Sequence, residues 1–514
     1  MSPLRVLGTL IAVLVLATRA GAFAATGADW LTYNGSYAGD RYSSLAEITP
    51  QNAARLKPVC AFQFGELGPM QSGPIVENGV MYVTTNDSTF ALDAATCKQQ
   101  WKSTYKPVGV PIGRVNRGVA MLGDRLFRGT SDSHLIALDR KTGKTLWDVT
   151  VSDSSDGSSV IQAPAAWDGK VFVGIAGGDL GAKGKVMGFS AADGKALWTF
   201  DVIPTGKQPG AKTWGNAASA ATGGGATWTT FTVDTKTGSV FVPVGNPGPD
   251  FSGDYRPGIN LYTCSIVVLD ANTGKLRWYW QMIPHDVHDW DVAAAPALFT
   301  GGNGKPYIAV GGKDGYLYML DGASHRVLSK TPITTIFNVD APLTAAGTRF
   351  CPVLGGVEWN GPAYSPVTKL TYVGTNDWCT TIKLGEVRFV RGKSFLGSAN
   401  GYGEKDPTLS GWLTAVDPLT GKIAWKYHAA TPVLAGVTPT EGGVVFTGEM
   451  GGEFHAFDAA SGKLLYSFNT GGSVVGGVAT YSVNGKQYVA AVSGNQSRTA
   501  FPGGGSPSLF IFSL

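Results

Sequence analysis

The chain has 514 residues, of which 43% are hydrophobic and 15% are charged, and glycine occurs 71 times. This composition is typical of many short strands joined by tight turns, and it excludes a disordered chain or a coiled coil. The formal net charge is only +4, so no strongly basic surface indicates binding to nucleic acid or anionic lipid.

The first element in chain order is a targeting segment. Arg5 precedes the apolar run VLGTLIAVLVLA, and small residues follow up to Ala24. An apolar run of this length predicts a secretory signal peptide over 1–24, with an uncleaved N-terminal anchor as the alternative. We therefore expect an exported, periplasmic protein whose mature part, 25–514, is a single domain with no transmembrane segment. Its net charge falls from +4 to +2 with the loss of Arg5 and Arg19.

A ten-residue motif recurs along the rest of the chain. It reads LDAATCKQQW at 92–101, LDRKTGKTLW at 138–147, FSAADGKALW at 189–198, LDANTGKLRW at 269–278, LDGASHRVLS at 320–329, VDPLTGKIAW at 416–425 and FDAASGKLLY at 457–466. Most copies are about 40 to 50 residues apart, which is the period of a four-stranded propeller blade. Aspartate begins a turn, glycine supplies its positive-φ position, and the terminal tryptophan can wedge between neighbouring blades.

Two gaps between copies are longer. The gap after 189–198 fits one repeat with an insertion, and the gap after 320–329 contains PAYSPVTKLTYVGTND, which indicates a degenerate eighth unit. Seven copies and this unit predict an all-β, eight-bladed β-propeller with tryptophan-docking motifs. A chance run of hairpins in a sandwich is the alternative, and seven regular copies argue against it.

The propeller topology predicts which polar residues meet. If the motif turn joins the third and fourth strands of a blade, the connections from second to third strand and from blade to blade lie on the opposite face. The polar and aromatic residues on these connections are Arg117, Asp179, Trp228, Asn246, Lys313, Asn376 and those of HDVHDWD at 285–291. Each alone has an ordinary interpretation as a turn or packing residue. Together they suit a flat, anionic ligand that is held with a hard cation.

The heptapeptide HDVHDWD has two interpretations. It contains two of the six histidines, so a transition-metal site is one of them. His285 and His288 are three residues apart in a loop with no further histidine nearby, which is a poor zinc site. A catalytic base with its supporting residues is the interpretation that we favour.

Five cysteines in an exported chain indicate disulfide bonds. The sequence alone leaves their pairing open. Proximity in the repeat scheme favours Cys60–Cys97 and Cys351–Cys379, with Cys264 free. No C-x-x-C-H motif occurs, so the chain carries no covalent c-type haem.

The sequence resembles the pyrroloquinoline quinone (PQQ)-dependent alcohol and sugar dehydrogenases, from DWLTYNGSYAGDRYSSLAEIT at 29–49 to GKQYVAAVSGN at 485–495. The most specific motifs are VNRGVA, GGGATW, GNPGPD, RPGINLYT, HDVHDWDV and CPVLGGVEWNGPAYSP. The resemblance implies an eight-bladed propeller that binds PQQ over a calcium ion. A lanthanide is the other option, because Asp291 matches an extra acid of lanthanide-using and sugar-type relatives.

The resemblance also implies residue roles. Asp289 matches the catalytic base, which removes the hydroxyl proton of an alcohol, polyol or sugar while hydride moves to the quinone. The implied cofactor contacts are Gln71, Arg117, Trp228, Lys313 and Asn376, and the implied metal ligands are Asp179, Asn246, Asp289 and Asp291. Electrons would then pass to an external acceptor such as a cytochrome c or a quinone.

The chain departs from the family pattern at several positions. Pro111 and Ile112 stand where the family often has adjacent cysteines, Asp179 replaces a glutamate, and Gln71 replaces an acidic cofactor contact. Outer-membrane assembly propellers use the same repeat without catalysis. The alternative function is therefore a non-catalytic scaffold for protein partners in the cell envelope.

Overall fold

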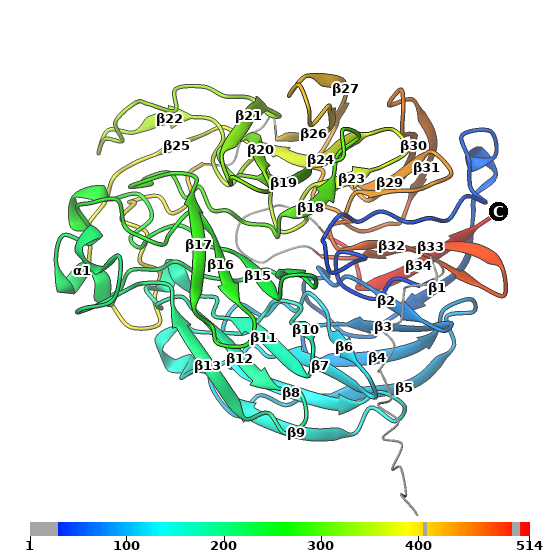
Figure 1. Cartoon of the computed structure of the whole chain (residues 1–514), viewed down its shortest axis with the longest axis horizontal. Helices are drawn as coiled ribbons and strands as arrows, with labels where there is room; N and C mark the ends of the chain where they lie inside the picture. The colour runs from blue at the N-terminus through cyan, green and yellow to red at the C-terminus, as the bar shows by residue number, and fades with distance from the viewer. Residues whose placement is uncertain (1–28, 405–408, 496–503) are drawn as a thin grey trace, which may run out of the picture.

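The computed structural model describes residues 29–404, 409–495 and 504–514, so the predicted signal peptide over 1–24 lies outside the described residues. The described residues form eight four-stranded antiparallel sheets. In Figure 1 these sheets follow one another around a ring, and the colour changes steadily from one to the next. The predicted all-β, eight-bladed propeller is confirmed.

Seven sheets, here called blades 1 to 7, are each formed by strands that follow one another in sequence from the innermost to the outermost. Blades 1 to 4 comprise β2 (Ile75–Glu77), β3 (Val80–Thr84), β4 (Ser88–Asp93) and β5 (Gln99–Thr104); β6 (Ala120–Leu122), β7 (Arg125–Gly129), β8 (His134–Asp139) and β9 (Thr145–Thr150); β10 (Ala165–Trp167), β11 (Lys170–Gly174), β12 (Lys185–Ser190) and β13 (Ala196–Asp201); and β14 (Thr232–Asp234), β15 (Ser239–Pro243), β16 (Ser265–Asp270) and β17 (Leu276–Gln281). Blades 5 to 7 comprise β18 (Ala297–Thr300), β19 (Pro306–Gly311), β20 (Tyr316–Asp321) and β21 (Val327–Pro332); β23 (Ala363–Ser365), β24 (Leu370–Asp377), β26 (Ser410–Val416) and β27 (Ile423–Ala429); and β28 (Thr438–Pro439), β29 (Val444–Gly448), β30 (Glu453–Asp458) and β31 (Leu464–Asn469).

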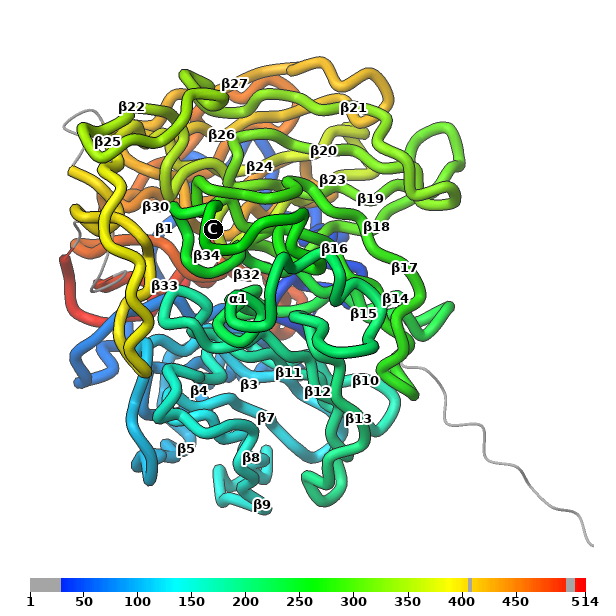
Figure 2. The backbone as a smooth tube through the Cα atoms, turned by 90° about the vertical axis from the view of Figure 1, so that its left-hand side faces the viewer, coloured from blue at the N-terminus to red at the C-terminus, as the bar shows by residue number. Residues whose placement is uncertain are grey.

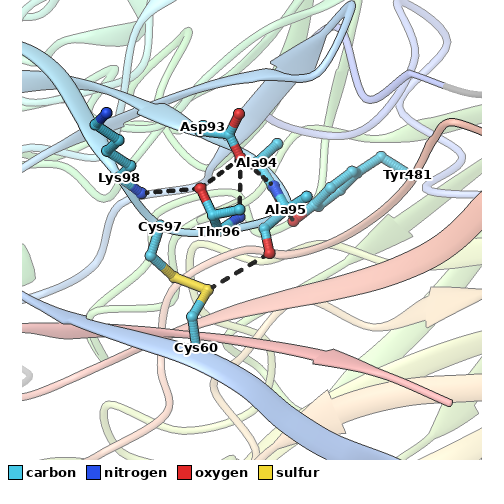
Figure 3. The surroundings of a disulfide bond; sticks show 8 residues. All are labelled: Cys60, Asp93, Ala94, Ala95, Thr96, Cys97, Lys98 and Tyr481. Carbon is cyan, nitrogen blue, oxygen red and sulfur yellow. Dashed lines mark hydrogen bonds between the residues drawn. A yellow bond between two sulfur atoms is a disulfide. The ribbon is translucent and has the colours of Figure 1, made fainter.

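Blade 8 closes the ring with strands from both ends of the described chain. Its inner strands are β32 (Val478–Val483), β33 (Lys486–Ser493) and β34 (Ser508–Ser513), and its outer strand is β1 (Lys57–Gln63), which pairs with β34. A disulfide joins Cys60 in β1 to Cys97 in the motif turn of blade 1, so it ties the closing strand to the first blade (Figure 3). Cys97 occupies the glycine position of the motif, with φ 61°. The predicted pairs Cys60–Cys97 and Cys351–Cys379 are both formed, and Cys264 is free and buried.

The position predicted for the eighth repeat is wrong. The strands in PAYSPVTKLTYVGTND are β23 and β24, and they belong to the same blade as the motif copy at 416–425. The long gap therefore contains one blade with two long connections. The motif-free blade is the C-terminal one, whose outer strand comes from the N-terminal side of the chain. Pairing between strands so distant in sequence leaves no mark in the repeat spacing.

Each motif tryptophan docks on the next blade, as the repeat predicts. The indole N–H of Trp198 donates to the carbonyl of Ala271, and a Cβ at Gly274 would lie 2.4 Å from the Trp198 ring. Trp101 and Trp147 make the same type of bond, to Arg140 and Ala191. The glycines of the turns that receive these three rings, Gly143, Gly194 and Gly274, thus provide both the positive φ and the space for the ring.

The apolar core lies between successive blades. For example, Phe127 and Leu135 of blade 2 pack against Val171 and Phe189 of blade 3 in one buried cluster. The second and third strands of a blade are mostly buried, whereas the outermost strands alternate between exposed and half-buried residues. This pattern leaves the central polar residues on a rigid, close-packed frame.

Helices are few and short in the described part of the chain, and none of them is long and apolar enough to cross a bilayer. They are α1 (Ala217–Ala221), η1 (Ala53–Arg55), η2 (Ser154–Asp156), η3 (Gly178–Leu180), η4 (Ala211–Thr213) and η5 (Gly253–Tyr255). Blade 6 carries the largest excursions, including the ribbon of β22 (Thr348–Phe350) and β25 (Thr380–Ile382). After β25, the segment 383–404 runs along one face of the propeller, which Figure 2 shows in yellow.

Candidate functional site

The connections predicted to share one face do converge. Asp179 and Asn246 lie between second and third strands of blades 3 and 4, and Lys313 lies on the same type of connection in blade 5. Arg117, Trp228 and the heptapeptide 285–291 lie on connections from one blade to the next. Contacts between these residues join blades 2 to 5 into one buried polar site.

Three carboxylates form the most acidic part of this site. Oxygen atoms of Asp179, Asp250 and Asp289 all lie within 4.8 Å of one another. Asp250 is fully buried and Asp289 is 2% exposed. Burial raises the pKa of Asp289 well above its usual range; Lys313 lowers it again, and Asp291 and Asp179 raise it further. A bound cation would therefore relieve the repulsion between these three buried carboxylates.

Asp291 is the centre of a hydrogen-bond network beside these carboxylates. Its Oδ1 accepts the backbone N–H of Asn246 at 2.6 Å, and its Oδ2 accepts the indole N–H of Trp228 at 2.8 Å. Lys313 Nζ lies 3.3 Å from Asp291 Oδ2 and 3.5 Å from Asp289 Oδ2. Asp291 thus fixes the tryptophan, the Asn246 loop and the lysine relative to one another.

Lys313 is the cation in ion-pair contact with the acids. Its side chain is 7% exposed. Burial alone would lower the pKa of this amine, but Asp289 and Asp291 raise it well above its ordinary value, so it stays charged. One ammonium group shared between two buried carboxylates leaves the site with an excess of negative charge.

The heptapeptide holds Asp289 in an unusual backbone conformation. Asp289 has φ 61°, a region that non-glycine residues occupy rarely and at a cost of about 1–3 kcal/mol. Asp286 stabilises the loop, because its two carboxylate oxygens accept the N–H groups of His288 and Trp290, both at 3.1 Å. His288 stacks on Trp290, with ring centroids 4.1 Å apart. The Nδ1–H of His285 donates to the carbonyl of Gly258, and His285 takes no part in the acidic cluster. The geometry therefore favours the base interpretation of this loop over a histidine metal site.

Arg117 and two aromatic rings form the adjoining wall. The Arg117 guanidinium lies 4.7 Å from the ring centroid of Trp228 and 5.4 Å from that of Trp359, and it donates to the Trp228 carbonyl at 3.2 Å. Burial lowers the pKa of Arg117 to about 10, against the opposing effect of Tyr33 and Glu358. Glu358 is a buried acid whose pKa is raised to about 7, first by burial. This wall combines a cation with flat apolar surfaces.

Two predicted cofactor contacts, Asn376 and Gln71, belong to blade 6 and to the connection from blade 8 to blade 1. Asn376 lies within β24 and not after it, and its backbone exchanges two 2.9 Å hydrogen bonds with Gly356, next to the Lys313 connection. Its side-chain N–H donates to the carbonyl of Leu354. Gln71 is buried on the connection from blade 8 to blade 1. For these two residues a cofactor role stays a prediction.

The segment 383–404 covers the carboxylates. Tyr402 donates its hydroxyl hydrogen to Asp179 Oδ2 at 2.6 Å, and the N–H of Phe395 donates to the Asp179 carbonyl at 2.7 Å. Arg391 forms an ion pair with Asp153 at 2.6 Å, on the connection between blades 2 and 3. The segment therefore spans the face from blade 6 to blade 3 and screens the acids from solvent.

Sequence reasoning missed Asp250, Glu358 and Tyr402. The face rule could have identified Asp250, because this residue follows Asn246 on the same connection. Glu358 and Tyr402 lie in the excursions of blade 6, where no repeat pattern places a residue relative to the channel. Their roles depend on how those excursions fold back over the site.

Comparison with known proteins identifies the family. The family model described as "Glucose/ethanol/alcohol dehydrogenase, beta-propeller domain" matches residues 30–333. The quinoprotein alcohol dehydrogenase PedH of Pseudomonas putida is 32% identical over 506 residues, which cover 89% of this chain and 84% of PedH. The chain belongs to the PQQ-dependent alcohol dehydrogenase family. The family resemblance of the sequence is thereby confirmed, and the protein is a quinoprotein dehydrogenase by membership of this family.

Other family members show the same similarity along most of their length. A lanthanide-dependent methanol dehydrogenase of Methylacidiphilum fumariolicum is 30% identical, over 90% of this chain and 84% of that protein. The solved structure of a europium-containing methanol dehydrogenase superposes with a TM-score of 0.85 at 28% identity, covering 95% of this chain and 98% of that one. A model named for the outer membrane protein assembly factor BamB matches only residues 409–501, and a BamB structure at 14% identity shares the fold alone.

The residues present fit a hard metal cation. Three carboxylates face one another, and neither side-chain oxygen of Asp250 has a hydrogen-bond partner in 29–404, 409–495 or 504–514. Buried carboxylates without partners are strongly unfavourable unless a cation neutralises them. All-oxygen ligands select hard cations such as Ca²⁺ over soft transition metals. A metal bound at the acidic cluster accounts for this arrangement.

Proposed function

We propose that the protein is a periplasmic PQQ-dependent dehydrogenase that oxidises a hydroxyl group of an alcohol, polyol or sugar. The observation that carries this proposal is the position of Asp289. Its carboxylate is buried, held at a positive φ, 3.5 Å from Lys313 Nζ, and beside the acidic cluster. A carboxylate that is fixed next to a metal and a cofactor wall is suited to removing a proton from a bound hydroxyl group.

Each binding group has residues suited to it. The metal would be held by Asp179, Asn246, Asp289 and Asp291, and the choice between Ca²⁺ and a lanthanide depends on their charge. PQQ would contact Arg117, Trp228, Lys313, Asn376 and Gln71. When bound, PQQ supplies the acceptor for hydride and the metal acts as a Lewis acid on it.

The protein's own residues would set up the proton transfer. Asp289 accepts the hydroxyl proton, and Lys313 holds this carboxylate in place through its ion pair. Trp228 supplies a flat surface, fixed by its bond to Asp291, against which a planar ring can lie. The segment 383–404 excludes bulk water from Asp179, because the Tyr402 hydroxyl and the Phe395 N–H both donate hydrogen bonds to this residue.

The cellular setting of the proposal rests on the N-terminal sequence and the cysteines. The predicted signal peptide over 1–24 and two disulfides favour export to an oxidising compartment. Electrons would pass to an external acceptor such as a cytochrome c or a quinone. The scaffold alternative requires only the blade motifs and gives no reason for a buried acidic cluster.

A dye-linked dehydrogenase assay of the protein reconstituted with PQQ and either Ca²⁺ or La³⁺ tests this function. We expect oxidation of at least one alcohol, polyol or sugar, and a loss in kcat of roughly 10²–10⁴-fold for Asp289→Asn. The matched control is Asp132→Asn, which changes a buried carboxylate of blade 2 that bonds Thr130 and the Val108 N–H. Equal activity of Asp289→Asn and the control would refute the assigned base.

A further inference from the structure

The carboxylate of Asp250 is buried without a partner among the residues that the structure describes. The residue is 0% exposed, and neither of its side-chain oxygens accepts a hydrogen bond within those ranges. Leaving a carboxylate buried and unpaired costs several kcal/mol. Because such groups are rare in folded proteins, the carboxylate of Asp250 calls for a partner that comes from outside the chain.

The neighbouring cation Arg256 does not supply this partner. Arg256 is fully buried, and its guanidinium donates to the carbonyls of Pro249, Asp250 and Asp286 and to the side chain of Asn260. These bonds fix the backbone around Asp250 and use all three guanidinium nitrogens. The carboxylate itself points to Asp179 and Asp289, whose oxygens lie within 4.8 Å of its own.

We propose that Asp250 is a direct ligand of the metal and biases the site towards trivalent cations. This inference rests on the proposed function, since it concerns the same metal. Asp179, Asp250, Asp289 and Asp291 bring four negative charges, and Lys313 returns one, which leaves three. A trivalent ion neutralises these charges, whereas a divalent ion leaves one buried and uncompensated. Large hard cations also accept the higher number of oxygen ligands that a further carboxylate provides.

Terbium binding gives a test that does not depend on catalysis. The purified mature protein is titrated with Tb³⁺, with La³⁺ and with Ca²⁺, and Tb³⁺ luminescence lifetimes in H₂O and D₂O count the water molecules on the bound ion. We expect Asp250→Asn to weaken Tb³⁺ and La³⁺ binding by roughly 10- to 100-fold, on the scale of losing a metal-site group. Ca²⁺ binding should weaken less, and the bound Tb³⁺ should gain about one water molecule because a ligand position opens.

The stability of the metal-free protein provides a second readout. With a chelator present, Asp250→Asn should raise the midpoint of thermal unfolding, because it removes one of several like charges. A purely structural role for Asp250 predicts a lower midpoint. Asp250→Ser serves if the asparagine variant folds poorly. The matched control is Glu449→Gln, a buried acid that bonds His455 in blade 7 and should leave metal binding unchanged.

The outcomes separate the two proposals. If the wild type binds Tb³⁺ and Asp250→Asn changes neither affinity nor water count, Asp250 is not a ligand, and the proposed dehydrogenase function stands. If the wild type binds none of the three ions, with or without added PQQ, both proposals fail. Equal weakening of Ca²⁺ and La³⁺ binding would overturn the preference for trivalent ions.

Discussion

Replacing Lys313 by methionine should destabilise the metal-free protein strongly. The ammonium group is buried and lies 3.3 Å from Asp291 Oδ2 and 3.5 Å from Asp289 Oδ2. Methionine keeps most of the apolar stem but leaves both carboxylates without their cation. Breaking a buried ion pair in this way costs about 3–5 kcal/mol. We therefore expect a decrease of this size in the free energy of unfolding.

Urea unfolding in the presence of a chelator, followed by tryptophan fluorescence, measures this effect. The control is Lys383→Met, because Lys383 is 42% exposed and lies 3.6 Å from Glu404, which is 69% exposed. An exposed pair of this kind contributes at most about 1 kcal/mol. Saturating La³⁺ should reduce the deficit of Lys313→Met, since the metal supplies positive charge at the same carboxylates. Equal, small effects of the two substitutions would refute the assignment of Lys313 as the cation that neutralises these acids.

Three further predictions concern the frame that holds the site. Cys264 is buried, and burial raises the pKa of its thiol well above its ordinary value. A thiol reagent should therefore detect no reactive group in the native protein and one per chain after denaturation without reductant. Gly274→Ala should lower the free energy of unfolding by about 1–3 kcal/mol more than Gly304→Ala does. Both glycines have positive φ, but only Gly274 contacts a docked tryptophan, so equal losses would contradict the docking. Hydrogen bonds from Arg277 lower the pKa of Asp270 to about 2, so its stabilisation is complete above its unfolded pKa of about 4 and is lost as pH falls towards 2. Acid titrations of stability should therefore show a smaller loss over that range for Asp270→Asn than for the wild type.

The repeat motif was sufficient to predict the fold, because its spacing and chemistry are local. Aspartate, glycine and tryptophan at fixed offsets determine a turn and a docking contact within one blade and the next. The ring closure was not predictable in this way. It depends on β1 pairing with β34, whose residues are almost a full chain length apart, and no periodic pattern marks that contact.

The site was predictable where residues lie on the connections between strands of regular blades. Asp179, Asn246, Lys313 and Asp291 meet as the face rule requires. The rule could not place Tyr402, since the segment 383–404 folds across the face by long-range contacts, such as the Arg391–Asp153 ion pair. The rule also covers Asp250, which follows Asn246 on the same connection, but an aspartate is common in turns and its sequence context does not reveal its burial.

The most direct test of the account is a PQQ titration of the purified mature protein, followed by absorbance and tryptophan fluorescence. It should be carried out with Ca²⁺, with La³⁺ and with a chelator. The account predicts saturable binding of one PQQ per chain that requires a metal and is lost in Asp179→Ala and Asn246→Ala. No binding under any of the three conditions, or binding that neither the chelator nor these substitutions affect, would contradict it.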